Sequence, residues 1–327
     1  MTRTIRTRAP GRVNLIGDHT DYTGGLVFPM AIDRWTEVSG VVADRIRLTS
    51  YHDEQPVDLP LDPPPVSAGW GRFVAAVAAE VRPTFGIEGV VQTTIPVGAG
   101  LSSSAALELT LALALGFEGP PLALAQLGRR AEHRATGVPC GIMDQLCIAA
   151  AKDGHATIID CHSFDVSHVP IPGDVEIVVS FVAHRELEAS GYAHRVAECA
   201  AAELVVGPLR TAALADIAAI EDPKVRRRAR HVITENQRVR DFAAALSLED
   251  YKSAGELMVE SHLSLRDDFE TSTDAMDRTQ GEILRQRGVL GARMTGGGFG
   301  GCIVSLCEPG AKLDGWRVRP VAGAART

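Results

Sequence analysis

The sequence has 327 residues, more than one hydrophobic core usually supports, so two domains that share a cleft are expected. Its 33 basic and 41 acidic residues give a net charge of −8, which argues against a nucleic-acid surface, because such surfaces need clustered Lys and Arg. No apolar run approaches the roughly 18 residues of a membrane span, so a soluble, cytoplasmic protein is predicted. The six cysteines form no CxxC pair, which argues against a structural zinc site.

The first unusual segment is APGRVNLIGDHTDYTGG, residues 9–25. It gathers an arginine, a histidine, two aspartates and several glycines near the amino terminus. Asp18, His19 and Asp21 supply the hydrogen-bond acceptors and donors that the hydroxyl groups of a sugar require. Arg12 adds a fixed cation, so this segment predicts a site for a polar, hydroxyl-rich ligand.

The second segment is IPVGAGLSSSAALE, residues 95–108, between a predicted strand at 90–95 and a predicted helix at 103–115. Its glycines let the backbone turn tightly, and the helix start directs N–H groups and the positive end of its dipole at one point, where a phosphate binds well. The segment lacks the Lys of a Walker A loop, so the backbone must supply most phosphate contacts. An ordinary capped helix is the alternative, but three successive serines favour a phosphate loop.

The third segment, AEHRATGVPCGIMDQL at residues 131–146, places two acidic residues in apolar surroundings. Glu132 lies near the end of a predicted helix at 122–134, and Asp144 follows in CGIMDQL. An ionised carboxylate in such a setting is costly without a partner. Each residue therefore either caps a helix or forms a salt bridge, or it has a functional role.

The second half of the chain mixes predicted strands with predicted helices, which favours an α+β fold over a doubly wound sheet. The segment HVPIPGD, residues 168–174, predicts a boundary between domains at 1–170 and 171–327. The arginine-rich run VRRRAR, residues 225–230, is interpreted as a solvated helix face. Strands are predicted at 156–159 and 176–181, and helices at 191–205, 225–246 and 274–286, with an alanine-rich helical segment at 197–220.

The last glycine-rich segment is RMTGGGFGGCIVSL, residues 293–306, which formally matches GxGxxG through Gly296, Gly298 and Gly301. A dinucleotide fingerprint needs a following helix and an acidic residue about twenty positions later, whereas CIVSL is strand-like. The segment therefore predicts a glycine loop between two strands, which brings backbone close to a neighbouring loop or ligand. This context argues against a dinucleotide-dependent oxidoreductase.

Together the segments supply the groups that phosphoryl transfer needs. These are a cradle for nucleotide phosphates, oxygen ligands for Mg²⁺, a carboxylate near the acceptor hydroxyl and a fixed cation for developing charge. The candidates, in that order, are residues 98–104, Glu132 with Ser104, Asp144, and Arg12.

In the same order along the chain, these segments resemble the motifs of the galactokinase family within the GHMP kinase superfamily. GRVNLIGDHTDYTGG is similar to the amino-terminal signature, PVGAGLSSSAALE to the phosphate loop, and MTGGGFGG to the carboxy-terminal glycine motif. AEHRATGVPCGIMDQ and RARHVITENQRV also resemble galactokinase sequence. The resemblance implies a two-domain α+β GHMP kinase fold, with a ribosomal protein S5 domain 2-like N-terminal domain, a ferredoxin-like C-terminal domain and the active site in the cleft between them.

The same resemblance implies ATP- and Mg²⁺-dependent phosphorylation of the anomeric C1 hydroxyl of galactose, by a monomer or weak homodimer. Asp144 resembles the catalytic aspartate and Arg12 its partner, while Ser104 and Glu132 resemble the Mg²⁺ ligands. The positions expected to line the sugar pocket are Asp18, His19, Asp21, Gly141 and Tyr192. Those expected to bind the nucleotide are Gly98, Gly100, Leu101, Ser102, Ser103, Ser104, Gly297 and Gly298; the adenine pocket is unassigned, with Trp35, Trp70 and Phe73 as aromatic candidates.

Three features depart from the family pattern. Asp18 stands where the family usually has Glu, at a position expected to contact the C6 hydroxyl of the sugar. Residues 180–183, within the segment 178–190, replace a small polar element, so an altered wall of the cleft is predicted. The helix expected after CIVSLCEPG is missing, so we expect local repacking or a partner chain there. A different acceptor, such as N-acetylgalactosamine or L-arabinose, and a non-catalytic galactose sensor remain alternatives.

Overall fold

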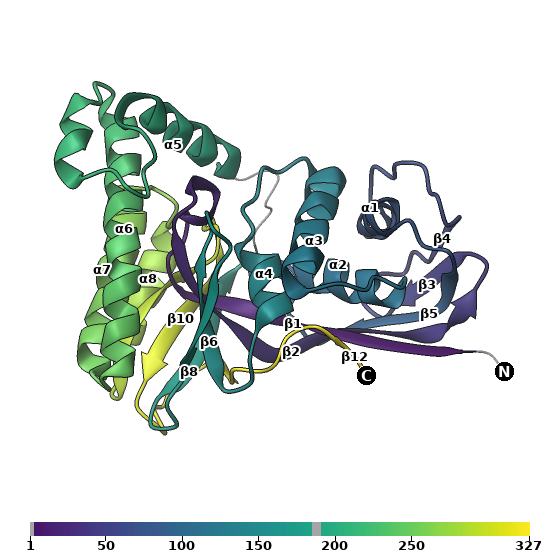
Figure 1. Ribbon diagram of the computed structural model, residues 1–327. Helices are drawn as coiled ribbons and strands as arrows, with labels where there is room; N and C mark the ends of the chain where they lie inside the picture. Colours follow the sequence, from purple (N-terminus) through teal and green to yellow (C-terminus); the bar gives the residue numbers. More distant parts are fainter. Residues whose placement is uncertain (1–2, 185–190) are drawn as a thin grey trace.

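The computed structural model describes residues 3–184 and 191–327, so part of the 178–190 segment lies outside the described residues. Two sheets, one of eight strands and one of four, carry most of the helices on their faces (Figure 1). This arrangement confirms the predicted α+β class. In the described part of the chain, no helix combines the length and apolar character that crossing a membrane requires.

The eight-stranded sheet has the order β12-β1-β2-β5-β3-β4, with β6 added beside β2 and β7 beside β6. Helices α1 to α4 pack on one another over this sheet (Figure 1). The bounds of the strands are β1 Thr4–Ile16, β2 Leu26–Ala43, β3 Ile46–Ser50, β4 Val57–Leu59, β5 Gly86–Thr93, β6 His155–Asp160, β7 Val166–Pro170 and β12 Ala325–Arg326. The helices are α1 Gly71–Val81, α2 Ser103–Ala114, α3 Pro121–Thr136 and α4 Met143–Ala150.

The four-stranded sheet has the order β11-β8-β10-β9, and α7 and α8 pack against it. Gly255 of α7 lies directly against β9, since a Cβ at this position would overlap the carbonyl of Leu290. The strands are β8 Glu176–Ala183, β9 Val289–Thr295, β10 Gly301–Cys307 and β11 Trp316–Val318. The helices are α5 Tyr192–Val206, α6 Pro223–Ser247, α7 Tyr251–Asp267 and α8 Asp274–Leu284, with 3₁₀ turns η1 Asp21–Thr23 and η2 Leu214–Ala219.

One hydrophobic cluster extends through both sheets, from Ile5 and Leu15 of β1 to Val179 of β8 and Val304 of β10. Polar contacts join the sheets as well, because the Asn14 amide donates to Thr295 Oγ1 at 2.9 Å. The domain boundary proposed near residue 170 stays a prediction.

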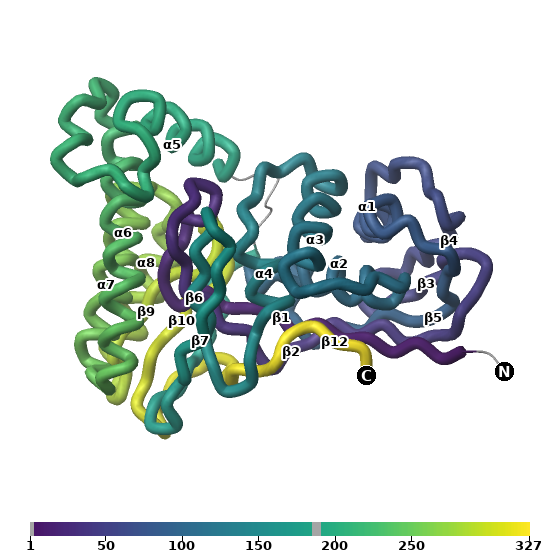
Figure 2. The backbone as a smooth tube through the Cα atoms, in the orientation of Figure 1, coloured from purple at the N-terminus to yellow at the C-terminus, as the bar shows by residue number. Residues whose placement is uncertain are grey.

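The end of the chain returns to the first sheet, where it runs beside β1 (Figure 2). Thr7 of β1 pairs with Arg326 of β12. The amides of Gly323 and Ala324 donate to the carbonyls of Ala151 and Ile148, at 3.0 and 2.8 Å, at the C-terminal end of α4. The last residues of the sequence therefore support the helix that begins at Met143.

The segments predicted as strands and helices take those forms, with ends that differ by a few residues. Helices α4 and α7 and strands β1 to β4 and β7 were not predicted. The glycine loop joins β9 to β10, two antiparallel strands, as predicted. The helix predicted over 197–220 is wrong beyond Val206, because Gly207 and Pro208 end α5 there.

Arg228 contradicts the interpretation of VRRRAR as a solvated helix face. Its side chain is 0% exposed and forms ion pairs with Glu198 at 2.7 Å and Glu270 at 2.5 Å. Its Nη1 also donates to the carbonyl of Asp268 at 2.6 Å. The guanidinium therefore joins α6 to α5 and to the turn after α7.

The helix expected after β10 is absent from residues 308–315, as predicted, and a loop runs from β10 to β11 instead. Local repacking accompanies this change, since the loop buries Ala311 and Leu313. Ser180 of β8 donates its Oγ proton to the carbonyl of Asp314 at 2.7 Å. The loop thus packs beside β8.

Candidate active site

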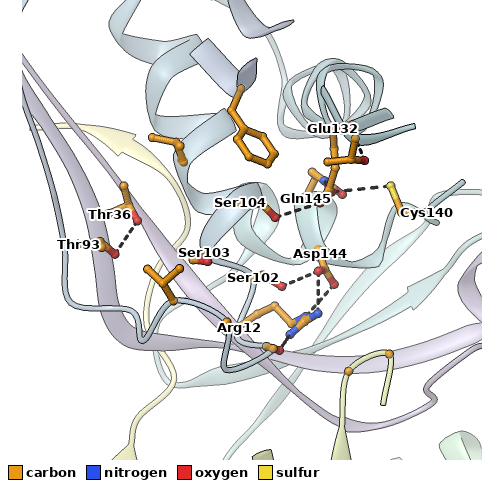
Figure 3. A pocket seen from close by; sticks show the side chains of 18 of the residues that line it. Arg12, Thr36, Thr93, Ser102, Ser103, Ser104, Glu132, Cys140, Asp144 and Gln145 are labelled. Carbon is orange, nitrogen blue, oxygen red and sulfur yellow. Dashed lines mark hydrogen bonds and ion pairs between the residues drawn. The ribbon is translucent and has the colours of Figure 1, made fainter. Parts of the chain in front are cut away.

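A cavity of about 530 Å³ brings together most of the residues singled out by sequence. Its wall includes the start of α2, the first turn of α4 and the loops that follow β1 and β9. Figure 3 shows the polar group at its centre. The expected residues that line the cavity are Arg12, Asp18, His19, Asp21, Gly98, Gly100, Ser102, Ser103, Ser104, Glu132, Gly141, Asp144, Tyr192 and Gly297; Leu101 and Gly298 do not line it.

Arg12 and Asp144 form a bidentate ion pair at the centre of this cavity (Figure 3). Arg12 Nε donates to Oδ1 and Nη2 to Oδ2 of Asp144, both at 2.7 Å. Ser102 Oγ donates to the same Oδ2 at 2.5 Å, and Arg12 Nη1 donates to the carbonyl of Gly100 at 2.7 Å. The Arg12 side chain is 3% exposed and that of Asp144 is 27% exposed, so the carboxylate is the member of the pair that faces the cavity.

The charge of Arg12 is maintained by this pairing. Burial alone would lower the pKa of Arg12, but the adjacent carboxylate of Asp144 and its hydrogen bonds raise the pKa above its usual value. The guanidinium is therefore a permanent cation at the base of the cavity.

The segment before α2 has the backbone form predicted for a phosphate loop. Gly98, Gly100 and Ser102 have φ values of 76°, 77° and 59°, in the left-handed region. Ser102 occupies the N-cap position without a side-chain cap, because its hydroxyl bonds Asp144 instead. The first turn of α2 thus presents backbone N–H groups that lack intrahelical acceptors. Leu101 is buried, and its carbonyl accepts from the Arg12 amide at 3.2 Å, which fixes the loop against β1.

Ser104 and Glu132 meet on the opposite side of Asp144 from Arg12 (Figure 3). Ser104 Oγ donates to Glu132 Oε1 at 3.0 Å. Burial, followed by the charge of Asp144, raises the pKa of Glu132, and hydrogen bonds from Ser104 and Gln145 oppose this shift. Among the described residues, no group of three or more His, Cys, Asp and Glu side chains is arranged to hold a metal ion. A cation here would have two protein oxygens and would need further ligands from substrate and water.

Gln145 was not singled out from the sequence, although it follows Asp144 directly. It is fully buried, and its Nε2 donates to Glu132 Oε2 at 2.6 Å and to Glu108 Oε2 at 3.2 Å. Burial, followed by the charge of Glu132, raises the pKa of Glu108 well above its ordinary value. The sequence signal for Gln145 is a second polar residue, directly after Asp144, in a helix whose other residues are apolar.

Asp21 and Gly141 lie in contact on the wall of the cavity. A Cβ at position 141 would overlap Oδ2 of Asp21, so only glycine leaves room for this carboxylate. Burial, followed by the charge of Asp144, raises the pKa of Asp21 to about 6. Gly141 thus holds the carboxylate of Asp21 close to that of Asp144.

Aromatic rings pack around His19 on the same wall. The His19 ring lies 4.6 Å from the Phe269 ring and 5.4 Å from the Tyr192 ring, between centroids. His19 Nδ1 is 3.0 Å from the hydroxyl of Tyr22. These contacts couple the first motif to the start of α5 and to the turn after α7.

Asp18 points its carboxylate into the protein interior. Its side chain is 1% exposed, and its Oδ2 lies 2.7 Å from Nη2 of Arg293. Oδ1 accepts a hydrogen bond from the amide of Gly296 at 3.1 Å. A second contact fixes the backbone beside Asp18, since the backbone amide of Gly17 donates to the Glu235 carboxylate at 2.9 Å. Asp18 therefore connects the first motif to the glycine loop after β9.

Gly298 and residues 180–183, which were expected at the site, lie away from the cavity. Gly298 faces the turn after α7, where a Cβ would overlap the carbonyl of Thr271. Residues 180–183 do not line the cavity, so the altered cleft wall predicted from them is wrong; Ser180 and Phe181 line a separate surface pocket beside α8. Ser180 contacts the loop between β10 and β11 instead, through the carbonyl of Asp314.

Two of the three aromatic candidates for the adenine pocket line the cavity and one does not. Trp70 and Phe73 line the far end of the cavity together with His52 and Thr93. Trp35 does not line it and stacks against the Arg8 guanidinium, 4.2 Å from the ring centroid. The cavity thus combines two aromatic side chains near the start of α1 with the charged group at Asp144.

Comparison with known proteins gives a consistent result along the chain. The galactokinase galactose-binding signature matches residues 2–40, the GHMP kinases N terminal domain residues 71–152, and the GHMP kinases C terminal domain residues 242–314. The galactokinase of Bos taurus is 41% identical over 94% of this chain and 84% of its own length. The galactokinase of Chloroflexus aggregans is 40% identical over 97% of this chain and 87% of its own length.

Solved structures agree with these matches. The galactokinase of Lactococcus lactis, crystallised with galactose, superposes with a TM-score of 0.91 at 28% identity, over 99% of this chain and 95% of its own. The mevalonate kinase of Methanococcus jannaschii superposes with a TM-score of 0.71 at 20% identity, over 98% of this chain and 99% of its own, a likeness of fold alone. The two-domain GHMP kinase fold expected from the sequence is confirmed.

Proposed function

Because this chain belongs to the galactokinase family of the GHMP kinases, we propose that it transfers the γ-phosphoryl group of ATP to the anomeric C1 hydroxyl of galactose. Kinases of this superfamily use ATP, and the chain is a sugar kinase by its family. The observation that carries the proposal is the Arg12, Asp144 and Ser102 group, which shares one cavity with the start of α2.

Asp144 is the residue that accepts the proton of the sugar hydroxyl or orients that hydroxyl. Arg12 and Ser102 hold its carboxylate, which faces the cavity, so the orientation of the carboxylate is fixed. A carboxylate fixed in this way orients the hydroxyl for attack on the phosphoryl group. Arg12 also lies where it stabilises negative charge that develops on the transferred group.

The nucleotide phosphates lie at the start of α2. Gly98, Gly100 and the first residues of the helix present backbone N–H groups toward the same cavity that Asp144 faces. The positive end of the helix dipole adds to their attraction for phosphate. The aromatic rings of Trp70 and Phe73, which line the same cavity, fit the adenine ring by stacking.

Ser104 and Glu132 fit the binding of Mg²⁺. Hydroxyl and carboxylate oxygens are the donors that this ion prefers, and Mg²⁺ often takes only one or two protein ligands beside substrate phosphates. The two side chains converge at 3.0 Å beside the phosphate loop. When bound, the ion would neutralise phosphate charge during transfer.

The sugar lies between Asp21, Gly141 and the His19–Tyr192 pair, next to Asp144. Asp21 offers acceptor oxygens, and Gly141 leaves the space that its carboxylate needs. This subsite rests on the match of the first segment to the galactose-binding signature.

The proposal is tested by measuring ATP- and Mg²⁺-dependent phosphorylation of galactose, 2-deoxygalactose, fucose, N-acetylgalactosamine, L-arabinose and glucose, beside the variant Asp144→Asn. We expect galactose to be preferred and kcat to fall by about 10²- to 10⁴-fold in the variant, with ATP binding retained. Preference for a sugar without a C6 hydroxyl would assign a different acceptor. Binding of galactose without phosphorylation of any sugar would contradict the kinase proposal and favour a sensor.

A further inference from the structure

We propose that Gln145, held in place by Glu108, is a positioning residue that orients the Glu132 carboxylate toward Ser104 and the metal. This inference rests on the proposed function, since it concerns the Mg²⁺ ligand Glu132. The three residues come from three different helices, Glu108 from α2, Glu132 from α3 and Gln145 from α4. They meet in the interior, where Glu108 and Gln145 are both 0% exposed.

The geometry divides the two oxygens of Glu132 between two tasks. Oε1 accepts from Ser104 at 3.0 Å, on the side of the phosphate loop. Oε2 accepts from Gln145 Nε2 at 2.6 Å and, more weakly, from Cys140 Sγ at 3.7 Å. With Oε2 held, rotation of the carboxylate is restricted and Oε1 stays directed at Ser104.

The amide of Gln145 needs its own support, and Glu108 gives it. An amide NH₂ group has two protons, and Gln145 Nε2 lies within hydrogen-bond distance of Glu132 Oε2 and of Glu108 Oε2, at 2.6 and 3.2 Å. Glu108 does not line the cavity, so it acts through Gln145 rather than on a ligand.

A glycine inside α3 makes room for this arrangement. A Cβ at Gly128 would lie 2.8 Å from Leu109 Cδ2 and 3.0 Å from Gln145 Cγ, with Glu108 Oε2 at 3.6 Å. Glycine within a helix lowers helix stability by about 1 kcal/mol relative to alanine. Gly128 is therefore explained by the room that the side chains of Leu109 and Gln145 need, and not by helix propensity. The α3 backbone thus approaches α2 and α4 closely enough for Gln145 to reach both carboxylates.

The variant Gln145→Met keeps the approximate size of the side chain and removes both donors. We measure Mn²⁺ affinity by electron paramagnetic resonance in the presence of a non-hydrolysable ATP analogue, together with KM for ATP and for galactose. The expected result is about tenfold weaker Mn²⁺ binding and a raised KM for ATP, with little change in KM for galactose. Glu108→Gln keeps an acceptor oxygen for Gln145 and is expected to retain most of the affinity.

Two further variants separate positioning from stability. Gln280→Met is the matched control, because Gln280 is also a buried glutamine, which donates to the carbonyl of Ala292 at 3.0 Å on α8, far from Glu132 in the chain and outside the cavity wall. It is expected to lower stability while Mn²⁺ affinity stays unchanged. Gly128→Ala displaces Gln145 without removing a polar group and is expected to weaken Mn²⁺ binding, so it tests the inference even where Gln145→Met does not fold.

Unchanged Mn²⁺ affinity in folded Gln145→Met, or in Gly128→Ala if the first variant does not fold, would overturn the inference while leaving the kinase proposal intact. A wild-type protein that phosphorylates galactose but binds no Mn²⁺ with the analogue would contradict the metal site and this inference with it. A wild-type protein that phosphorylates no sugar yet shows the expected changes in Mn²⁺ binding would contradict the proposed function alone.

Discussion

The Asp18 carboxylate lies 2.7 Å from the guanidinium of Arg293, and both side chains are almost completely buried. Glu235 is the next charge, 3.8 Å from Arg293, and it too is buried. Removing one member of a buried ion pair leaves an uncompensated charge in the interior. The pair therefore makes the position of the first motif dependent on β9.

Arg293→Met is expected to lower the free energy of unfolding by about 3–5 kcal/mol, because it leaves Asp18 and Glu235 without this cation. The measurement is urea unfolding followed by circular dichroism. The double variant Asp18→Asn with Arg293→Met is expected to recover part of the loss, since it removes the Asp18 charge that Arg293 would have paired, while Glu235 keeps its ion pair with Arg238 at 2.7 Å. A double variant whose loss equals the sum of the two single losses would show that the pair is not coupled.

Arg12→Lys is expected to reduce kcat by about 10²- to 10³-fold, because lysine cannot reproduce the bidentate contact with Asp144. Steady-state kinetics with galactose and ATP provide the measurement. Arg8→Lys, on the same strand but outside the cavity wall, is the control and is expected to leave kcat unchanged. Similar kcat values for Arg12→Lys and wild type would mean that charge alone, and not geometry, is required.

Gly141→Ala is expected to lower kcat/KM for galactose by up to about 100-fold, because the added Cβ must displace the carboxylate of Asp21. The KM for ATP is expected to change much less. Gly281→Ala is the matched control, since a Cβ at this position in α8 meets nothing within 4 Å. That control is expected to keep full activity and to gain roughly 0.4–1 kcal/mol of stability. Equal kinetics for the two variants would contradict the role of Gly141.

Stability without ligand is expected to fall as the pH rises from about 4 to 6, through the ionisation of Asp21. Burial, followed by the charge of Asp144, raises the pKa of Asp21 from 3.8 to about 6. The folded chain therefore retains a proton that the unfolded chain releases, so the contribution is complete below pH 3.8 and is lost as the pH passes 6. Urea unfolding of wild type and Asp21→Asn between pH 4 and 7 checks this. The wild type is expected to lose stability relative to the variant as the pH rises; a constant difference would refute the assignment.

The sequence was sufficient for features that are local or that belong to a motif. The strand, turn and helix around residues 90–115 were predictable because glycine, serine and apolar periodicity occur together there. Arg12 and Asp144 were paired through the family resemblance, and the structure brings them together. Motif residues are thus predictable even when they lie far apart in the chain.

Other features depend on packing between distant elements and leave little trace in the sequence. In the sequence Arg228 resembles the surface arginines beside it, because its partners Glu198 and Glu270 lie far away in the chain. Helix α7 was not predicted, since its buried face includes Gly255, Ser261 and His262, which interrupt the apolar stripe that marks a helix in sequence. The inward orientation of Asp18 likewise depends on Arg293, a residue from the other end of the chain.

The pairing of β12 with β1 joins the first strand of the chain to a strand that is synthesised last, so this pairing must wait for β12 to be made. Strand β1 and the helix that carries Asp144 leave the ribosome early, yet the amides of Gly323 and Ala324 that bond the end of that helix are made near the end of this sequence. A nascent chain stalled before residue 320 lacks those bonds, and so does a fragment cut there by a protease. The end of the helix that carries Asp144 is therefore capped only once residues 323 and 324 have been made, and a premature stop codon before them removes that support.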